Sequence, residues 1–448
     1  MVRLNACVPE VREDDPAAEQ VLPGVRREAV AYTTTDIIRS INSVAESMTA
    51  MPKVQLTEQE HLRRIAAVRT KMEQAGMDAL YLVSRPSIFY LTGYSYISTE
   101  RPLAIVVPLD GKVTFMGPLL EKGHIPLRTR LIPRIRTYLD YPGTKHPMEH
   151  FARFLKGMKL HTRVIGIDVS AGALSEWGYS GPRISEMLPR AKFVDAHDII
   201  PAMRVVKSPE EIGLIIESAK WANLALTLLQ EHVKPGEWDV EVAAKASLEA
   251  SSLMKKTLGP GFEPQVSGLP AAVGFRGQVG PKSAVPHSIS TAKPIERGDV
   301  LVAESGPNVG GYFSELERTM IVGSPTPMQR KYFEIMLEAQ DAALEAFKPG
   351  ARCRDVDVAA NRVLRARGCR RFIRHHTGHG LGLEEHEPPW LDVGDKTIMS
   401  AGMVFSCEPG VYIPGVGGFR HSDSVLIKKE GAEILTRYPR DIESLTIA

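Results

Sequence analysis

A short motif that occurs twice in the second half of the chain limits the folds the chain can adopt. Residues 234–244 read KPGEWDVEVAA, and residues 348–360 read KPGARCRDVDVAA. In each copy a long helical segment stops at Lys-Pro-Gly, and Asp-Val-x-Val-Ala-Ala opens a second helix. A duplicated α+β unit predicts two pseudo-symmetric halves with helices outside and polar groups converging in the cleft between them.

The chain before this repeat has the pattern of a separate domain. Thr57-Glu58-Gln59-Glu60 is a capping box, which satisfies backbone N–H groups at the start of a helix that runs to about Glu73. Segments typical of strands follow, at residues 79–83, 104–107, 113–116, 164–168 and 193–195. This alternation predicts an α/β domain over residues 56–203.

The boundaries of the remaining parts follow from similar signals. A second capping box at Ser208–Glu211 has proline in its first turn and opens a long amphipathic helix, so the catalytic domain is predicted at residues 204–448. Residues 1–55 are polar and weakly periodic, which predicts an N-terminal extension.

Composition excludes several classes of protein. The formal net charge of +2 gives no electrostatic reason to bind nucleic acid or a membrane surface. No uninterrupted apolar run approaches the roughly 20 residues needed to span a bilayer. The cysteines lack metal-binding spacing and are predicted to be reduced thiols in a cytoplasmic protein; they are Cys7, Cys353, Cys369 and Cys407.

Acidic side chains gather on a predicted hairpin. An apolar strand over residues 300–304 ends in Glu304, Gly310-Gly311 makes a tight return, and residues 312–322 form the partner strand. Glu315 and Glu317 on that strand are two residues apart and share one face. Acids that face inward are costly unless they are paired, bound to metal or catalytic.

Histidines and a further acid follow in a glycine-rich segment. His379 lies in Thr377-Gly-His-Gly-Leu-Gly382, where glycines allow close approach of the backbone to a ligand. His386 follows it, and Glu408 ends the strand predicted over residues 403–407. Two histidines near glycine and proline indicate a site more strongly than one.

These motifs, in this order and with the duplicated half-domains, resemble the creatinase, aminopeptidase P and prolidase family with the "pita-bread" fold, over residues 57–448. The resemblance implies a creatinase-like α/β N-terminal domain before a pseudo-two-fold α+β catalytic domain. It also implies a homodimer.

The resemblance implies a metal-ligand set that is incomplete. The family's peptidases bind two metal ions through two aspartates, a histidine and two glutamates. The matching positions here are Glu304, Glu315, His379 and Glu408, but the last, bridging glutamate falls on Ser422. A serine hydroxyl is a poor substitute for a bridging carboxylate.

Other residues resemble creatinase, the metal-free branch. Leu316-Glu317-Arg318-Thr319 matches its hairpin motif, and His287 has the spacing of its catalytic histidine. Arg101 matches an arginine that holds substrate carboxylate in the partner subunit's site, a role suited to a guanidinium. The segment from His386 to Trp390 is instead similar to the peptidases.

The expected function is therefore hydrolysis of a C–N bond in a small, carboxylate-bearing substrate without a cofactor. His287, Glu317, His386 and Glu408 are the predicted catalytic residues, and Arg101, Glu304 and His379 the predicted substrate-binding residues. The alternative is a metal-dependent Xaa-Pro peptidase with one Mn, Fe, Zn or Co ion on Glu315, His379 and Glu408. A sulfonium-propionate lyase, with Glu385 as its acid, and a non-catalytic binding protein are further alternatives.

Overall fold

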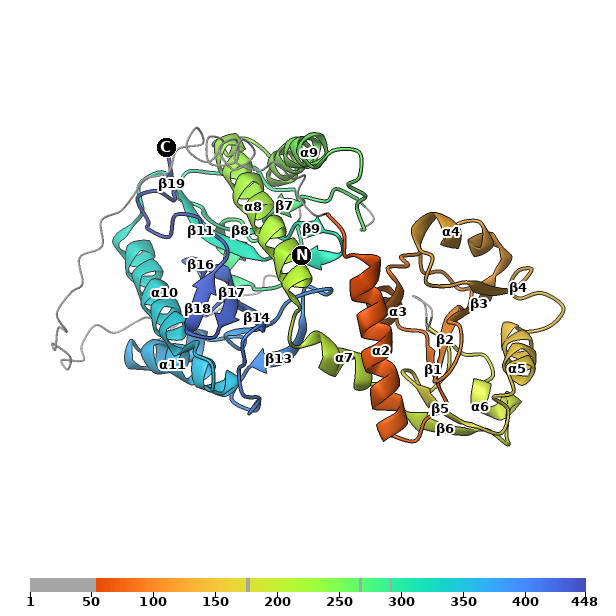
Figure 1. Cartoon of the computed structure of the whole chain (residues 1–448). Coiled ribbons are helices and arrows are strands. Elements are labelled where there is room, and N and C mark those ends of the chain that lie inside the picture. Colours follow the sequence, from red (N-terminus) through yellow and green to blue (C-terminus); the bar gives the residue numbers. More distant parts are fainter. Residues whose placement is uncertain (1–53, 175–177, 266–267, 291) are drawn as a thin grey trace, which may run out of the picture.

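The computed structural model describes residues 54–174, 178–265, 268–290 and 292–448. The predicted extension over residues 1–55 lies outside this range except for its last two residues, and so does Cys7. Figure 1 shows an N-terminal domain, coloured red to yellow-green, beside a larger C-terminal domain, coloured green to blue.

A mixed six-stranded sheet forms the centre of the N-terminal domain, in the order β4-β3-β2-β1-β5-β6. Side chains of β1 alternate between its two faces: Leu80 and Leu82 pack against α2, whereas Ala79 and Tyr81 pack against α5. The elements are α2 (Glu58–Gln74), β1 (Ala79–Leu82), α3 (Arg85–Thr92), β2 (Ala104–Pro108), β3 (Thr114–Pro118), η1 (Leu119–Lys122), α4 (Ile125–Arg128), β4 (Arg134–Tyr138), α5 (Pro147–Gly157), β5 (Val164–Ile167), α6 (Ile184–Met187), β6 (Lys192–Asp195) and α7 (Ile199–Arg204).

Strand β4 is not among the predicted strands. It reads Arg-Ile-Arg-Thr-Tyr, lies at the sheet edge, and exposes Arg134 and Arg136. Charged side chains protect an edge strand from pairing with other chains, and they also weaken the apolar pattern by which strands are predicted.

Only half of the capping box expected at Thr57 forms. The Thr57 hydroxyl accepts a hydrogen bond from the Glu60 N–H at 3.2 Å, as predicted. The Glu60 carboxylate pairs with Arg63 and Arg64 instead of returning to Thr57. Glu210, in helix α8 (Pro209–His232), accepts hydrogen bonds from both the N–H and the hydroxyl of Thr57, at 2.9 Å each. A contact between the domains therefore replaces the local one.

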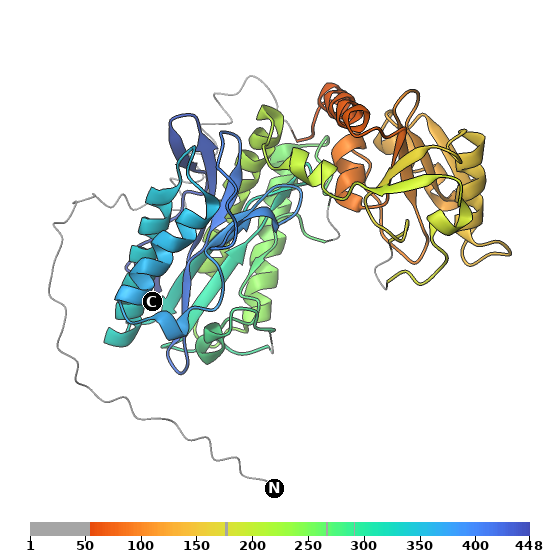
Figure 2. The same cartoon turned by 90° about the horizontal axis from the view of Figure 1, so that it is seen from below.

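The C-terminal domain contains a nine-stranded sheet in the order β13-β12-β14-β17-β11-β8-β7, with β18 beside β17 and β19 beside β11. In Figure 2 the helix pairs α8/α9 (green) and α10/α11 (cyan) flank these strands. The elements are α8 (Pro209–His232), α9 (Asp239–Leu258), β7 (Val273–Gly274), η2 (Gly280–Ala284), β8 (Val300–Ser305), β9 (Asn308–Val309), β10 (Tyr312–Phe313), β11 (Leu316–Val322), α10 (Pro327–Ala346), α11 (Cys353–Ala366), η3 (Arg370–Phe372), β12 (Gly378–Gly380), β13 (Glu387–Leu391), β14 (Val404–Cys407), β15 (Gly410–Ile413), β16 (Gly417–Arg420), β17 (Ser422–Lys428), β18 (Gly431–Ile434) and β19 (Thr446–Ile447).

Both copies of the repeated motif join two packed helices, as predicted. The first copy connects α8 with α9, and the second connects α10 with α11. The residue before the second helix, Trp238 or Arg352, forms an isolated β-bridge in each copy, with Pro294 or Ile398. The two halves therefore have the same type of helix-to-helix connection. The predicted architecture of an α/β domain before a pseudo-two-fold α+β domain is confirmed.

Within the described part of the chain, α8 is long and apolar enough to cross a membrane by length and composition, although charged residues interrupt its apolar run. In the structure 67% of its apolar window is buried. Leu214, Ala222 and Leu229 contribute to the main core, so the apolar character serves packing. The capping box at Ser208 and Glu211 starts this helix as predicted.

The partner strand of the predicted hairpin is interrupted. Tyr312 and Phe313 form β10, which pairs with β9, and β11 begins only at Leu316. Glu315 lies in the break, where its backbone N–H donates to the Ser424 hydroxyl at 2.9 Å. Glu315 therefore lies just outside the regular pairing of β11 with β8, which begins at Leu316.

Candidate active site

Neighbouring strands place the acidic residues around one centre. Glu317 in β11 pairs in register with Glu304 in β8 and with Ser422 in β17. Carboxylate oxygens of Glu315, Glu317 and Glu408 lie within 4.8 Å of one another. Glu408 reaches this centre from the end of β14, so elements distant in sequence supply the cluster.

His379 in β12 brings an imidazole to the same centre. Its Nε2 lies 3.2 Å from Glu408 Oε1 and 3.5 Å from Glu315 Oε2. Nδ1 lies 3.0 Å from the Gly380 carbonyl oxygen, which can only accept, so Nδ1 carries the proton of the neutral ring. Nε2 is buried and has no hydrogen-bond partner among the described residues. The His386 ring stacks on the His379 ring at 3.8 Å between centroids.

Burial and mutual charge shift the pKa values of the cluster in different directions. Burial and the Glu408 carboxylate raise the pKa of Glu315 to about 8. Burial opposes ionisation of His379, but Glu315 and Glu408 outweigh it and raise its pKa to about 9. Burial also disfavours the Glu408 carboxylate, yet His379 and Arg420 hold its pKa well below the usual range. Burial and the neighbouring His379 lower the pKa of His386 to about 4, so that imidazole is neutral at pH 7.

Two arginines that the sequence pattern does not indicate enter the cluster. Arg276 Nη2 lies 2.5 Å from Glu304 Oε2 and 3.3 Å from Glu317 Oε1. Arg420 pairs with the same Glu317 oxygen, and its Nε lies 3.8 Å from Glu408 Oε2. The other oxygen of Glu317 is buried without a hydrogen-bond partner among the described residues. Glu317 is therefore clamped at one oxygen and free to accept at the other.

Both arginines end the same tripeptide, which marks their positions in the sequence but does not show what they contact. Gly-Phe-Arg occurs at residues 274–276 and again at residues 418–420. In both copies the phenylalanine, Phe275 or Phe419, is buried in the main core, and the arginine reaches the cluster.

Two predicted site residues do not contact the cluster within one chain. His287 is exposed in the loop after η2 and makes no hydrogen bond or ion pair with any described residue. Arg101 pairs with Glu100 and with Asp140 in the N-terminal domain. Catalysis by His287 and action of Arg101 in a partner subunit stay predictions. The other predicted residues converge: Glu304, Glu315, Glu317, His379, His386 and Glu408.

The donor atoms fit one divalent cation. Ligand bonds of about 2.1 Å place neighbouring ligand atoms about 3.0–3.4 Å apart. The separation of 3.2 Å from His379 Nε2 to Glu408 falls within this range, and that of 3.5 Å to Glu315 lies just above it. With Nδ1 donating to the Gly380 carbonyl, Nε2 would coordinate a cation after releasing the proton that its raised pKa keeps there without metal. A set for two cations is incomplete, because Ser422 donates its hydroxyl to Glu315 at 2.6 Å and Arg276 binds Glu304.

A cavity of about 440 Å³ lies between the domains and adjoins the loop that carries His386. Half of its twelve lining residues are apolar or aromatic, and Arg85, Ser95, Gln265, Asn308 and Glu384 supply polar groups. The apolar and aromatic members are Pro86, Phe89, Tyr94, Tyr96, Phe313 and Leu383.

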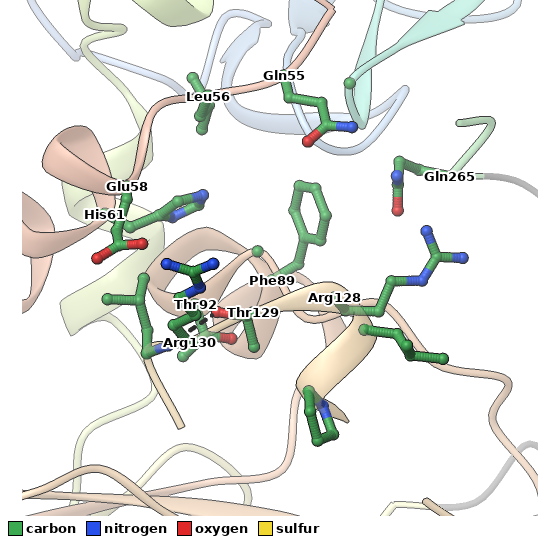
Figure 3. A pocket seen from close by; sticks show the side chains of 15 residues that line it. Gln55, Leu56, Glu58, His61, Phe89, Thr92, Arg128, Thr129, Arg130 and Gln265 are labelled. Atoms are coloured by element: carbon green, nitrogen blue, oxygen red, sulfur yellow. Dashed lines mark hydrogen bonds between the residues drawn. The ribbon is translucent and has the colours of Figure 1, made fainter. Parts of the chain in front are cut away.

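A second cavity of about 360 Å³ lies away from the chemistry. Figure 3 shows Gln55 and Leu56 on one side of it and Arg128, Thr129 and Arg130 on another. None of the residues of the acidic cluster lines it. We assign the active site to the cluster; of the two cavities, the one of about 440 Å³ is lined by Leu383 and Glu384 of the loop that carries His386.

Comparison with known proteins agrees with this geometry. The model of the creatinase/prolidase N-terminal domain matches residues 64–206, and the model of metallopeptidase family M24 matches residues 213–429. An Xaa-Pro dipeptidase from Pyrococcus horikoshii is 32% identical over 377 residues, covering 83% of this chain and 96% of that protein. The chain belongs to metallopeptidase family M24.

Solved structures of M24 relatives have the same fold. The prolidase from Pyrococcus horikoshii OT3 has a TM-score of 0.69 and 28% identity, covering 85% of this chain and 99% of that chain. A dipeptidase from Mycobacterium ulcerans has a TM-score of 0.71 and 26% identity, covering 88% and 99%. The predicted pita-bread fold and a hydrolase acting on C–N bonds are confirmed.

Family membership corrects the expected cofactor. The prediction that the enzyme needs none is wrong, because the matching family is one of metallopeptidases and the relatives are Xaa-Pro dipeptidases and prolidases. The preference for a creatinase-like branch is also unsupported. Ser422 removes the bridging ligand of a two-metal site, but Glu315, His379 and Glu408 still form a donor set for one metal ion.

Proposed function

We propose that this M24 enzyme hydrolyses small peptides, with Xaa-Pro dipeptides as its first candidate substrates, and uses a divalent cation held by Glu315, His379 and Glu408. One observation carries the proposal: His379 Nε2 is buried, has no hydrogen-bond partner among the described residues, and faces two carboxylates at ligand spacing. Imidazole and carboxylate donors suit Mn, Fe, Zn or Co. A bound cation would supply Lewis acidity and a water nucleophile at neutral pH.

His386 and Glu317 have complementary parts in this reaction. Hydrolysis adds the water oxygen to the carbonyl carbon and a proton to the leaving nitrogen as the C–N bond breaks. The neutral His386 imidazole, stacked on His379, keeps an N–H that can stabilise the developing oxyanion. Arg276 and Arg420 orient Glu317, whose free oxygen can accept a hydrogen bond from the substrate ammonium.

The neighbouring cavity supports an apolar substrate side chain or ring. Its volume of about 440 Å³ falls within the range of small-molecule sites, about 300–1,000 Å³. Phe89, Tyr96 and Phe313 present aromatic surface against which a proline ring can pack. Leu383 and Glu384, from the loop that carries His386, line the cavity, which supports placing a substrate side chain there.

The test compares metal content with hydrolysis. We expect protein stripped of metal to regain cleavage of Ala-Pro on addition of Mn²⁺, and to cleave Ala-Ala more slowly. His379→Ala should lose bound metal and lower kcat/KM by at least about 100-fold. His232→Ala is the matched control. His232 pairs with Glu249 and not with any residue of the cluster, so metal content and kcat/KM should stay unchanged.

Full activity in chelated protein, or unchanged metal content in His379→Ala, would refute the proposed ligands. Equal rates on Ala-Ala and Ala-Pro would refute the preference for proline while leaving the metal site intact.

A further inference from the structure

We propose that Arg276 takes the place of a second metal ion, so that each active site binds a single divalent cation. This inference rests on the proposed function, because it concerns the same metal site. The Arg276 guanidinium lies between Glu304 and Glu317, which are direct cross-strand neighbours in β8 and β11. It therefore contacts two carboxylates that would otherwise be available to a second cation.

A guanidinium in this position excludes a cation for two reasons. It has five N–H donors, no lone pair to offer as a ligand, and a positive charge that it cannot lose at ordinary pH. Arg276 donates to Glu317 Oε1 and places its Nη2 against Glu304 Oε2, so it occupies the space in front of both oxygens, and the like charges of guanidinium and cation repel. Arg420, which pairs with Glu317 and approaches Glu408, adds to this repulsion.

The charges of the cluster balance with one ion. Glu304, Glu315, Glu317 and Glu408 contribute four negative charges when ionised, and the two arginines offset two of them. One divalent cation neutralises the remainder. A glutamate in place of Ser422 would have added another negative charge and a bridging ligand, but the hydroxyl there only donates to Glu315.

The local backbone is built to present Arg276. Its φ of +47° lies in the left-handed region, which is unfavourable for a residue other than glycine and requires support from its surroundings. Phe275 anchors one side in the main core. On the other side Gly277, with φ of +73°, packs so closely on the Ile289–Ser290 backbone that a Cβ would lie 2.4 Å from the Ile289 carbonyl carbon. The strained position is therefore held by packing.

The experiment counts ions. Full-length protein is stripped with chelator, equilibrated with Mn²⁺ by dialysis, and analysed by elemental mass spectrometry and by electron paramagnetic resonance. We expect about one Mn²⁺ per chain and the signal of isolated Mn²⁺ in the wild type. Because Ser422 lacks the bridging carboxylate, the Arg276 variants are made together with Ser422→Glu, which by itself should still bind about one ion. In that background Arg276→Gln should bind about two, with a spin-coupled signal, and Arg276→Lys about one, because lysine keeps the charge.

Arg276→Ala provides a second neutral variant, and circular dichroism and thermal melting establish that each variant is folded. Arg437→Ala, at a side chain that is 80% exposed, is the control for loss of an arginine and should bind about one ion. Two ions in the wild type, or one ion in both folded neutral variants, would overturn the role proposed for Arg276. Neither result would affect the proposed metal-dependent function. A wild type that binds no Mn²⁺ would overturn the proposed metal-dependent function together with it.

Discussion

Arg64 joins the two domains through a buried charge, and its removal should destabilise the protein strongly. The side chain is fully buried. Its Nε lies 2.9 Å from Glu60, and its Nη2 lies 3.1 Å from Glu211 of α8. It also donates to the Tyr90 carbonyl at 3.0 Å and to the Tyr312 hydroxyl at 3.2 Å. Since Tyr312 lies in β10, just before Glu315, this contact links the N-terminal domain to the active-site strand.

The structure allows the size of the effect to be estimated for Arg64→Met. Loss of one partner from a buried ion pair costs about 3–5 kcal/mol, because the remaining charge stays buried. Glu60 retains Arg63, and Glu211 retains hydrogen bonds from the Tyr312 hydroxyl and the Ser208 N–H, both at 2.8 Å. These contacts offset part of the loss, so we expect about 3 kcal/mol.

Arg63→Met is the matched control. Arg63 pairs with the same Glu60 carboxylate at 2.7 Å, but its side chain is 57% exposed. Exposed pairs contribute at most about 1 kcal/mol. Urea denaturation followed by circular dichroism measures the free energy of unfolding of both variants. A difference between them below about 1 kcal/mol would refute the argument that burial, rather than the number of ion pairs, decides the cost.

Two further predictions concern pH and the metal ligands. Burial raises the pKa of Asp168 from 3.8 to about 6. The folded protein therefore binds more protons than the unfolded chain between about pH 4 and pH 6, and its stability falls as pH rises through that window, by up to about 3 kcal/mol. Asp168→Asn should remove this contribution, and equal pH dependence of Tm in variant and wild type would contradict it. Glu408→Gln should weaken Mn²⁺ binding at least about 100-fold in dialysis without changing the circular dichroism spectrum, whereas unchanged affinity would exclude Glu408 as a ligand.

Local patterns in the sequence predict the elements and most of the acidic cluster. The duplicated Lys-Pro-Gly motif predicts both helix pairs because proline and glycine end helices regardless of tertiary context. Alternation along β8 and β11 places Glu304 and Glu317 on one face. Edge strand β4 is not predicted, because its exposed arginines interrupt the apolar pattern of a strand. The break before β11 is not predicted either, because the Glu315 N–H donates to the Ser424 hydroxyl in place of a backbone carbonyl of a neighbouring strand.

Arg276 and Arg420 could not be assigned from local pattern, because long-range packing determines where they point. Arg276 reaches Glu304 only through a turn that depends on the approach of Gly277 to the Ile289–Ser290 backbone. Arg420 reaches Glu317 from β16, which is distant in sequence from β11. The same tripeptide delivers both arginines, but a tripeptide carries no information about its contacts.

The mistaken expectation of a metal-free site has the same physical origin. Ser422 is visible in the sequence as a missing ligand, and a missing bridging carboxylate argues against two metal ions. It does not argue against one, because Glu315, His379 and Glu408 still converge at ligand spacing. A ligand pattern shows how many donors are lost, whereas the number of cations a site can hold depends on all its charges. Here two guanidinium groups offset part of the negative charge of the cluster, so Ser422 and Arg276 together fit a site for one ion.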